Sequence, residues 1–155
     1  MQAGQQRVAT KGNRTEESEL RRSIEDWLDA VRTKDTDRLL SHYAPSVTTF
    51  DLAPPMVNRG RDAIRDKWLT WMSSFEGPIG YDFTEQHIDV HGDIAFLFSV
   101  NRIRGKQKGK DEPTDMHVRV TVGLRCVAGK WLVIHEHISL PFDMKTMKAC
   151  LDARP

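Results

Sequence analysis

One stretch near the end of the chain decides the fold: Gly129-Lys130-Trp131-Leu132-Val133-Ile134-His135-Glu136-His137-Ile138-Ser139-Leu140-Pro141-Phe142. A Gly-Lys turn opens it, β-branched and aromatic residues fill it, and Pro141 closes it where a backbone N–H can be spared. This pattern is typical of one long β-strand, whose side chains alternate between two faces. One face is apolar except for Glu136. The other face carries Trp131, Val133, His135, His137 and Ser139. That second face turns from apolar to polar along its length, which predicts the wall of a pocket.

Length, charge and cysteine content exclude several classes of protein. The chain has 155 residues, which is the length of one domain. Its 23 basic and 22 acidic residues nearly balance, so the sequence lacks the excess positive charge that is typical of proteins that bind nucleic acid or an anionic membrane. Two cysteines, Cys126 and Cys150, are typical of a reduced intracellular protein. No apolar run approaches the roughly 18 residues of a membrane span, and residues 1–13 lack the apolar segment of a secretory signal. We therefore expect a cytoplasmic protein.

Helical periodicity predicts three helices in the N-terminal half. Residues 1–15 show no periodicity and are predicted to be a flexible tail. Apolar residues recur at helical spacing over residues 15–34 and again over residues 60–75, where Gly77-Pro78 is expected to end the helix. Between them, Asp35-Thr36-Asp37 is expected to cap a short helix that carries Tyr43 and ends at Pro45.

Strand patterns dominate the remainder. Residues 47–50 are predicted to form a short strand with Asp51 at its exit, before a Pro-rich turn. Further strands are predicted at residues 81–90, 94–104 and 115–127, and residues 105–113 form a charged, solvated connector. Helices followed by an antiparallel meander predict an α+β fold, with the helices packed across one face of a curved sheet. The domain is predicted to cover residues 16–142, with a C-terminal extension at residues 143–155.

These elements resemble the nuclear transport factor 2-like superfamily, which includes ketosteroid isomerases and SnoaL-type polyketide cyclases. The resemblance rests on the Leu39-Leu40-Ser41-His42-Tyr43-Ala44-Pro45 segment, the strand that ends at Asp51, the Gly60-Arg61-Asp62-Ala63-Ile64 helix start and the closing strand. The Arg-x-Thr and His-x-His-x-Ser patterns are most similar to the SnoaL-like branch. The resemblance implies three helices packed on a strongly curved, mostly antiparallel sheet, which forms a cone with an internal pocket. It covers residues 16–142.

Only some of the catalytic residues of ketosteroid isomerases have a counterpart at the matching positions of this sequence. Asp51 falls where ketosteroid isomerases place an aspartate general base. The position of their oxyanion-hole tyrosine holds Trp27, and the position of their second aspartate falls near Thr121. The base is therefore kept, but the oxyanion pair of the isomerases is missing, which argues against a steroid isomerase. The fold by itself does not define a reaction.

Asp51 and His137 are the first candidate catalytic residues. Apolar pocket walls would raise the pKa of Asp51 and make it a useful base, although an Asp at this place can also cap the following turn. His135 and His137 share a face about 7 Å apart. His137 is expected to relay a proton, and the alternative is a core histidine with satisfied hydrogen bonds. A metal site would need a third ligand such as His117, for which no spacing signature exists, so no metal is expected.

Arg119 is the third candidate catalytic residue. It is expected either to hold a substrate oxygen or to form a structural ion pair with Asp51 or Glu136. Direct pairing with Asp51 would lower the pKa of that carboxylate and weaken its role as a base. The residues expected to contact a ligand are Trp27, Tyr43, Trp68, Asn101, Thr121 and His135.

Together these patterns favour a protein that binds a small, largely apolar carbonyl compound. Its expected chemistry is that of an isomerase, cyclase or dehydratase without a cofactor, in which Asp51 takes a proton from carbon. The alternatives are a non-catalytic ligand-binding or assembly module and a metal enzyme that uses the histidine pair. A homodimer is expected through the sheet face opposite the pocket. That face is predicted to carry Val118, Val120, Val122, Ile134 and Ile138.

Overall fold

Three helices precede or interrupt the strands in the computed structural model, which describes residues 11–155. They are α1 (Lys11–Arg32), α2 (Thr36–Leu40) and α3 (Arg61–Ser73). Asp35 caps α2 as predicted, because its Oδ1 accepts a hydrogen bond of 3.0 Å from the backbone N–H of Arg38. Helix α1 begins inside the predicted tail, and the rest of that tail, residues 1–10, lies outside the described residues.

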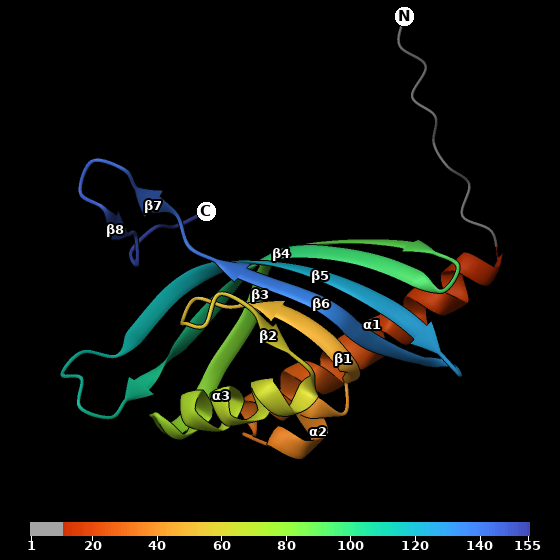
Figure 1. The fold of residues 1–155 in the computed structure, drawn as a ribbon, viewed down its shortest axis with the longest axis horizontal. Coiled ribbons are helices and arrows are strands. Elements are labelled where there is room, and N and C mark those ends of the chain that lie inside the picture. The colour runs from red at the N-terminus through yellow and green to blue at the C-terminus, as the bar shows by residue number, and fades with distance from the viewer. Residues whose placement is uncertain (1–10) are drawn as a thin grey trace, which may run out of the picture.

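The strands form one six-stranded sheet and a separate small hairpin (Figure 1). The sheet order is β2-β1-β6-β5-β4-β3, and every pairing is antiparallel except that of β1 with β6. Its strands are β1 (Tyr43–Phe50), β2 (Asn58–Arg59), β3 (Phe75–His91), β4 (Ile94–Gln107), β5 (Thr114–Val127) and β6 (Lys130–Ser139). The hairpin of β7 (Phe142–Asp143) and β8 (Lys148–Ala149) begins at the last residue of the predicted domain and continues into the predicted C-terminal extension. The predicted α+β class is confirmed, and the curved sheet does not close into a barrel.

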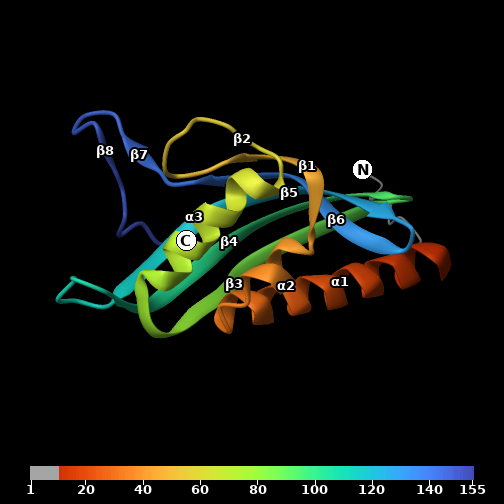
Figure 2. The same cartoon turned by 60° about the horizontal axis from the view of Figure 1, so that its bottom comes forward.

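The helices lie on the concave side of the sheet, where α1 runs along β3 and α3 contacts β1 (Figure 2). Alternate residues of β5 point to this side and are buried. They are Val118, Val120, Val122 and Leu124. The prediction that these valines form an exposed face for a partner is wrong, because the helices cover them. The homodimer itself stays a prediction.

Prolines and glycines explain where two predicted boundaries differ from the structure. Tyr43 begins β1 instead of continuing α2, and it pairs with Val133 of β6. Pro45 lies inside β1 at a register shift, where the ladder can do without its N–H. Gly77 and Pro78 likewise lie at an irregularity inside β3, after α3 has already ended at Ser73.

A bulge in β6 reverses the predicted faces of the closing strand. Gly123 of β5 pairs with His135, but the next residue, Leu124, pairs with Val133, so Ile134 is an extra residue. An extra residue shifts the alternation of every side chain beyond it. Glu136 therefore joins Val133 on the inner face, with Glu136 only 6% exposed. The prediction that the two histidines face the pocket is wrong for this reason.

In the described part of the chain, no helix has the length and apolar character that crossing a membrane requires.

Candidate active site

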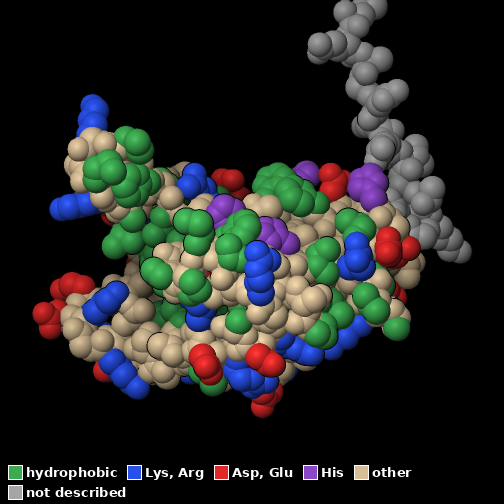
Figure 3. Space-filling view, in the orientation of Figure 1, with side chains coloured by type: hydrophobic (Ala, Val, Ile, Leu, Met, Phe, Trp, Pro, Cys, Tyr) green, Lys and Arg blue, Asp and Glu red, His purple; other side chains and the backbone are tan. Residues whose placement is uncertain are grey.

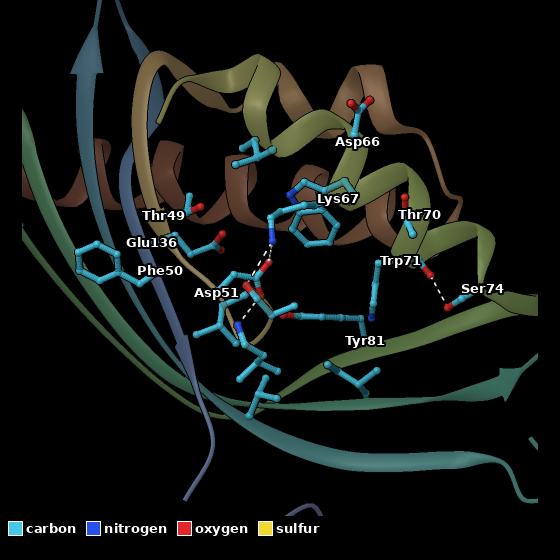
Figure 4. Close-up of a pocket in the computed structure, with 17 residues that line it drawn as sticks. Thr49, Phe50, Asp51, Asp66, Lys67, Thr70, Trp71, Ser74, Tyr81 and Glu136 are labelled. Atoms are coloured by element: carbon cyan, nitrogen blue, oxygen red, sulfur yellow. Dashed lines mark hydrogen bonds and ion pairs between the residues drawn. The ribbon is translucent and has the colours of Figure 1, made fainter. Parts of the chain in front are cut away.

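A cavity of about 530 Å³ lies between α3 and the concave side of the sheet (Figure 4). Its walls are mainly aliphatic and aromatic, and the polar groups among them include three carboxylates, Asp51, Asp66 and Glu136. Trp68 and Trp71 of α3 form one wall, as the sequence predicts for Trp68, and their rings meet edge to face at 5.5 Å. A cavity of this size and composition fits a small apolar molecule with a few polar atoms.

Asp51 follows the last residue of β1 and lies at this cavity, as predicted. Its Oδ1 accepts a hydrogen bond of 2.6 Å from the backbone N–H of Leu52, and its Oδ2 lies 3.7 Å from Nζ of Lys67. Lys67 also donates to the carbonyl oxygen of Pro54 at 2.9 Å. Lys67 therefore ties α3 to the turn after β1. Asp51 both caps its turn and faces the cavity, so the two interpretations of the sequence hold together.

Glu136 is a further carboxylate of the cavity, and it was not among the predicted site residues. Tyr43 donates a hydrogen bond to its Oε2 at 3.2 Å, and Nε1 of Trp27 donates to Oη of Tyr43 at 3.3 Å. Burial raises the pKa of Glu136 to about 7; the hydrogen bond from Tyr43 opposes this, and the negative charge of Asp51 adds to it. Burial also raises the pKa of Tyr43, which keeps its hydroxyl neutral and able to donate. At neutral pH, Glu136 is therefore present in both its acid and its ionised form.

The sequence did contain one signal for Glu136. It is the single ionisable residue on an otherwise aliphatic strand face, and a buried carboxyl group is costly unless it has partners or a function. The bulge at Ile134 concealed that signal, because strict alternation assigned this face to the outside of the sheet.

Tyr81 of β3 supplies a further polar group to the cavity. Nδ2 of Asn101 donates to Oη of Tyr81 at 3.1 Å, which leaves the Tyr81 hydroxyl hydrogen free to be donated. Burial raises the pKa of Tyr81, so the hydroxyl stays protonated. Asn101 itself faces the inside of the sheet, as predicted, but it lines a smaller neighbouring cavity together with Trp27.

Four predicted site residues lie on the outer face of the sheet, away from this cavity. Nδ1 of His135 lies 2.9 Å from the carbonyl oxygen of Thr48, and His137 pairs with Thr121 across the β5–β6 ladder. Arg119 donates to the carbonyl oxygen of Leu140 at 2.9 Å, so it contacts no carboxylate of the cavity. Figure 3 shows histidines and hydrophobic side chains gathered on the face seen in this view. The predicted pocket roles of Arg119, Thr121, His135 and His137 are not compatible with these positions.

Within residues 11–155, no three His, Cys, Asp or Glu side chains come together in a way that would hold a metal ion.

A family model described as a SnoaL-like domain matches residues 20–143. A structure of an NTF2-like protein of unknown function from Pseudomonas putida KT2440 is 34% identical, covers 92% of this chain and 98% of its own, and superposes with a TM-score of 0.81. A search of curated proteins gave no match.

More distant structures share the fold. A provisionally named scytalone dehydratase from Novosphingobium aromaticivorans DSM 12444 is 17% identical over 95% of this chain and 99% of its own, with a TM-score of 0.76. A provisionally named ketosteroid isomerase from Shewanella frigidimarina NCIMB 400 is 19% identical over 80% of this chain and 97% of its own, with a TM-score of 0.66. At these identities the likeness shows the fold alone.

Proposed function

The chain belongs to the SnoaL-like domain family. From that premise, and from Asp51 and Glu136 at its cavity, we propose that it catalyses proton transfer on a small, apolar carbonyl compound without a cofactor. Asp51 is the base, and the acid form of Glu136 is its counterpart. The observation that carries the proposal is that Asp51 and Glu136 line one apolar cavity in different surroundings. Such pairs divide into an acid and a base.

The two carboxyl groups differ in contact with water. The Asp51 side chain is 31% exposed and lies near the Lys67 ammonium group, whereas Glu136 is buried and bonded to Tyr43. Burial raises the pKa of Glu136 to about 7 and the negative charge of Asp51 adds to this, so the acid form of Glu136 is available near neutral pH. A group with a pKa near the working pH is well suited to acid–base catalysis.

The proposed steps balance in protons. Asp51 takes a proton from the carbon next to the carbonyl group, and the electron pair of the broken C–H bond moves toward the carbonyl oxygen. Glu136 or Tyr81 donates a hydrogen bond or a proton to that oxygen as its negative charge develops. Asp51 then returns its proton to another carbon, which is an isomerisation, or to a hydroxyl group that leaves as its C–O bond breaks, which is a dehydration. In both cases the C=O bond re-forms, and the oxygen gives back any proton that it took from Glu136 or Tyr81.

The cavity walls restrict the substrate to an apolar compound. Ile64 and Trp71 from α3 face Ile103, Val118 and Ile138 from the sheet. Such walls exclude water and strengthen the charge interactions inside the cavity. We therefore propose a ring-sized ketone or hydroxyketone as the substrate class. The likeness in fold to a provisionally named isomerase and a provisionally named dehydratase supports the same two reaction types.

The test measures exchange of the acidic C–H protons of enolisable cyclic ketones with D₂O by proton NMR. The protein is expected to accelerate exchange for at least one member of the panel, and Asp51→Asn is expected to reduce the rate by roughly 10²-fold or more while the ketone still binds. Asp66→Asn is the matched control, because Asp66 lies at the same cavity but points away from Asp51 in Figure 4. A ketone that binds with no accelerated exchange would favour a non-catalytic binding module.

A further inference from the structure

A second cavity, of about 50 Å³, lies on the other side of Glu136. It lies between α1 and the inner faces of β4, β5 and β6, and Glu136 lines both this cavity and the larger one. Its walls are mostly aliphatic, but five polar residues interrupt them. They are Ser23, His42, Ser99, Asn101 and Glu136. The volume exceeds the roughly 10–15 Å³ that a single water needs.

Two buried polar atoms at this cavity have no hydrogen-bond partner among the described residues. They are Oγ of Ser99 and Oδ1 of Asn101, and the two residues are 6% and 2% exposed. Asn101 uses its Nδ2 to donate to Tyr81, so its orientation is fixed and Oδ1 is left as an acceptor. Buried polar atoms are almost always bonded, and ordered water is the usual partner when the protein offers none.

A chain of side chains leads from this cavity to the surface. Oγ of Ser23 lies 3.2 Å from Nδ1 of His42, and Nε2 of His42 lies 2.8 Å from Oδ2 of Asp26. The Asp26 side chain is 44% exposed and also accepts a hydrogen bond from Arg38. Burial lowers the pKa of His42, so the ring is neutral at neutral pH. Its Nε2–H then donates to Asp26, and Nδ1 accepts from the Ser23 hydroxyl group.

We propose that the second cavity is a water site, whose ordered water bonds Glu136, Ser99 and Asn101 and continues through Ser23 and His42 to Asp26 at the surface. This gives Glu136 a proton-exchange route that bypasses the ligand cavity. The use of the route in catalysis rests on the proposed function, whereas the water site does not.

Proton movement along the route is balanced. For release, Glu136 passes a proton to water, water to Ser23, Ser23 to Nδ1 of His42, Nε2 of His42 to Asp26, and Asp26 to bulk water. Uptake runs in the opposite direction and restores the original tautomer of His42.

Ser23, His42 and Asp26 also share the residue types of a hydrolytic triad, but their surroundings differ. Ser23 lies in the interior of α1, where backbone N–H groups bond within the helix and cannot stabilise an oxyanion. The arrangement therefore suits proton relay and not nucleophilic attack.

The first test measures the pKa of Glu136 by ¹³C NMR of its side-chain carboxyl carbon, without any ligand. Ser99→Val fills the cavity and removes the water, so the ionised carboxylate loses a hydrogen bond and its pKa is expected to rise by about one unit. Ser99→Ala is the matched variant. It removes the same hydroxyl group but leaves room for water held by Asn101, so a shift of less than about half a unit is expected. Equal pKa values in the two variants would overturn the proposal.

The titration responds to the charged and titratable groups that share a cavity or a contact with Glu136. They are Tyr43 and Asp51 at the two ends of β1, Tyr81 of β3, Asp66 and Lys67 of α3, and His42, which lies just before β1. None of these changes in either Ser99 variant, so the comparison isolates the water.

The second test is a high-resolution crystal structure of the unaltered chain, which stays decisive if Ser99→Val does not fold. Water density is expected within hydrogen-bond distance of Oδ1 of Asn101 and of the Glu136 carboxyl group, with a further contact to Oγ of Ser23. An empty cavity would overturn the water site, and density that leaves Ser23 without a water contact would overturn the route. Neither result depends on turnover, so each is distinct from a failure of the proposed function.

Discussion

Glu136 and His137 are neighbours in the sequence but lie on opposite faces of the same strand. Glu136 is buried at the junction of two cavities, and its pKa is raised to about 7 by burial. His137 is exposed on the outer face, where its ring meets that of Phe50 at 5.5 Å. Histidine has the better intrinsic pKa for acid–base chemistry near neutral pH. The position of each side chain relative to the cavity nevertheless makes Glu136 the acid–base group, and burial gives its carboxyl group a pKa close to that of a free histidine.

The two faces also differ in what their polar side chains bond. On the inner face, Trp27, Tyr43 and Glu136 form a continuous hydrogen-bonded chain that ends at the cavity. On the outer face, His135 and Arg119 each bond a backbone carbonyl group of a neighbouring segment. The inner groups are arranged around an open volume, whereas the outer groups stabilise the ends of strands.

The largest expected effect is on the rate of proton exchange, which should fall when Glu136 is replaced but not when His137 is replaced. Glu136→Gln keeps the size of the side chain but cannot donate a titratable proton, so the rate of ketone proton exchange is expected to fall roughly 10²-fold or more. His137→Gln is expected to change that rate by less than about twofold. The exchange assay in D₂O measures both. A larger loss in His137→Gln than in Glu136→Gln would reverse the assignment of the faces.

The next effect is on stability as a function of pH. The pKa of Glu136 is about 7 in the folded chain, against 4.5 as its ordinary value, so the folded state binds the proton more tightly. The contribution of the protonated group is fully present below pH 4.5 and is lost as the pH rises through about 7. Between about pH 5 and about pH 8, this loss is on the order of 2 kcal/mol in the free energy of unfolding.

Urea unfolding of the unaltered chain and of Glu136→Gln measures this difference directly. The unaltered chain is expected to lose more stability than Glu136→Gln as the pH rises over that range. His137→Gln serves as the control and is expected to follow the unaltered chain. If Glu136→Gln and the unaltered chain lose stability in parallel, Glu136 has an ordinary pKa.

A smaller effect is expected from Tyr43→Phe, which removes the hydroxyl group between Trp27 and Glu136. The hydrogen bond from Tyr43 lowers the pKa of Glu136, so its loss should raise that pKa, by about one unit if the bond is of usual strength. NMR titration of the Glu136 carboxyl carbon detects the change. The exposed outer face offers a control in Thr121→Val, which should leave the titration unchanged. If the pKa of Glu136 is unchanged in Tyr43→Phe, Tyr43 does not influence the Glu136 carboxyl group.

Much of the fold follows from local patterns in the sequence. Helical spacing located α3, Asp35 identified the start of α2, and alternation with β-branched residues located the four long strands. The α+β class followed from their order. Strand β2 has two residues and the β7–β8 hairpin has two in each strand, so neither is long enough to show a period.

The candidate site was predictable only where it depends on the end of an element. Asp51 comes directly after β1, so its place at the cavity follows from the strand exit. Glu136 depends on which face of β6 is buried, and that depends on one extra residue, Ile134. A bulge leaves little trace in the composition of a strand, because its geometry arises from pairing with the neighbouring strand. The bulge at Ile134 therefore explains both why His135 and His137 were wrongly assigned to the pocket and why Glu136 was missed.

The central claim is that burial turns Glu136 into an acid that titrates near neutral pH at the wall of the cavity. A ¹³C NMR titration of side-chain carboxyl carbons, with Glu136 assigned by comparison with Glu136→Gln, measures this directly. The account predicts a midpoint of about 7 for Glu136. A midpoint at its ordinary value of 4.5 would contradict it.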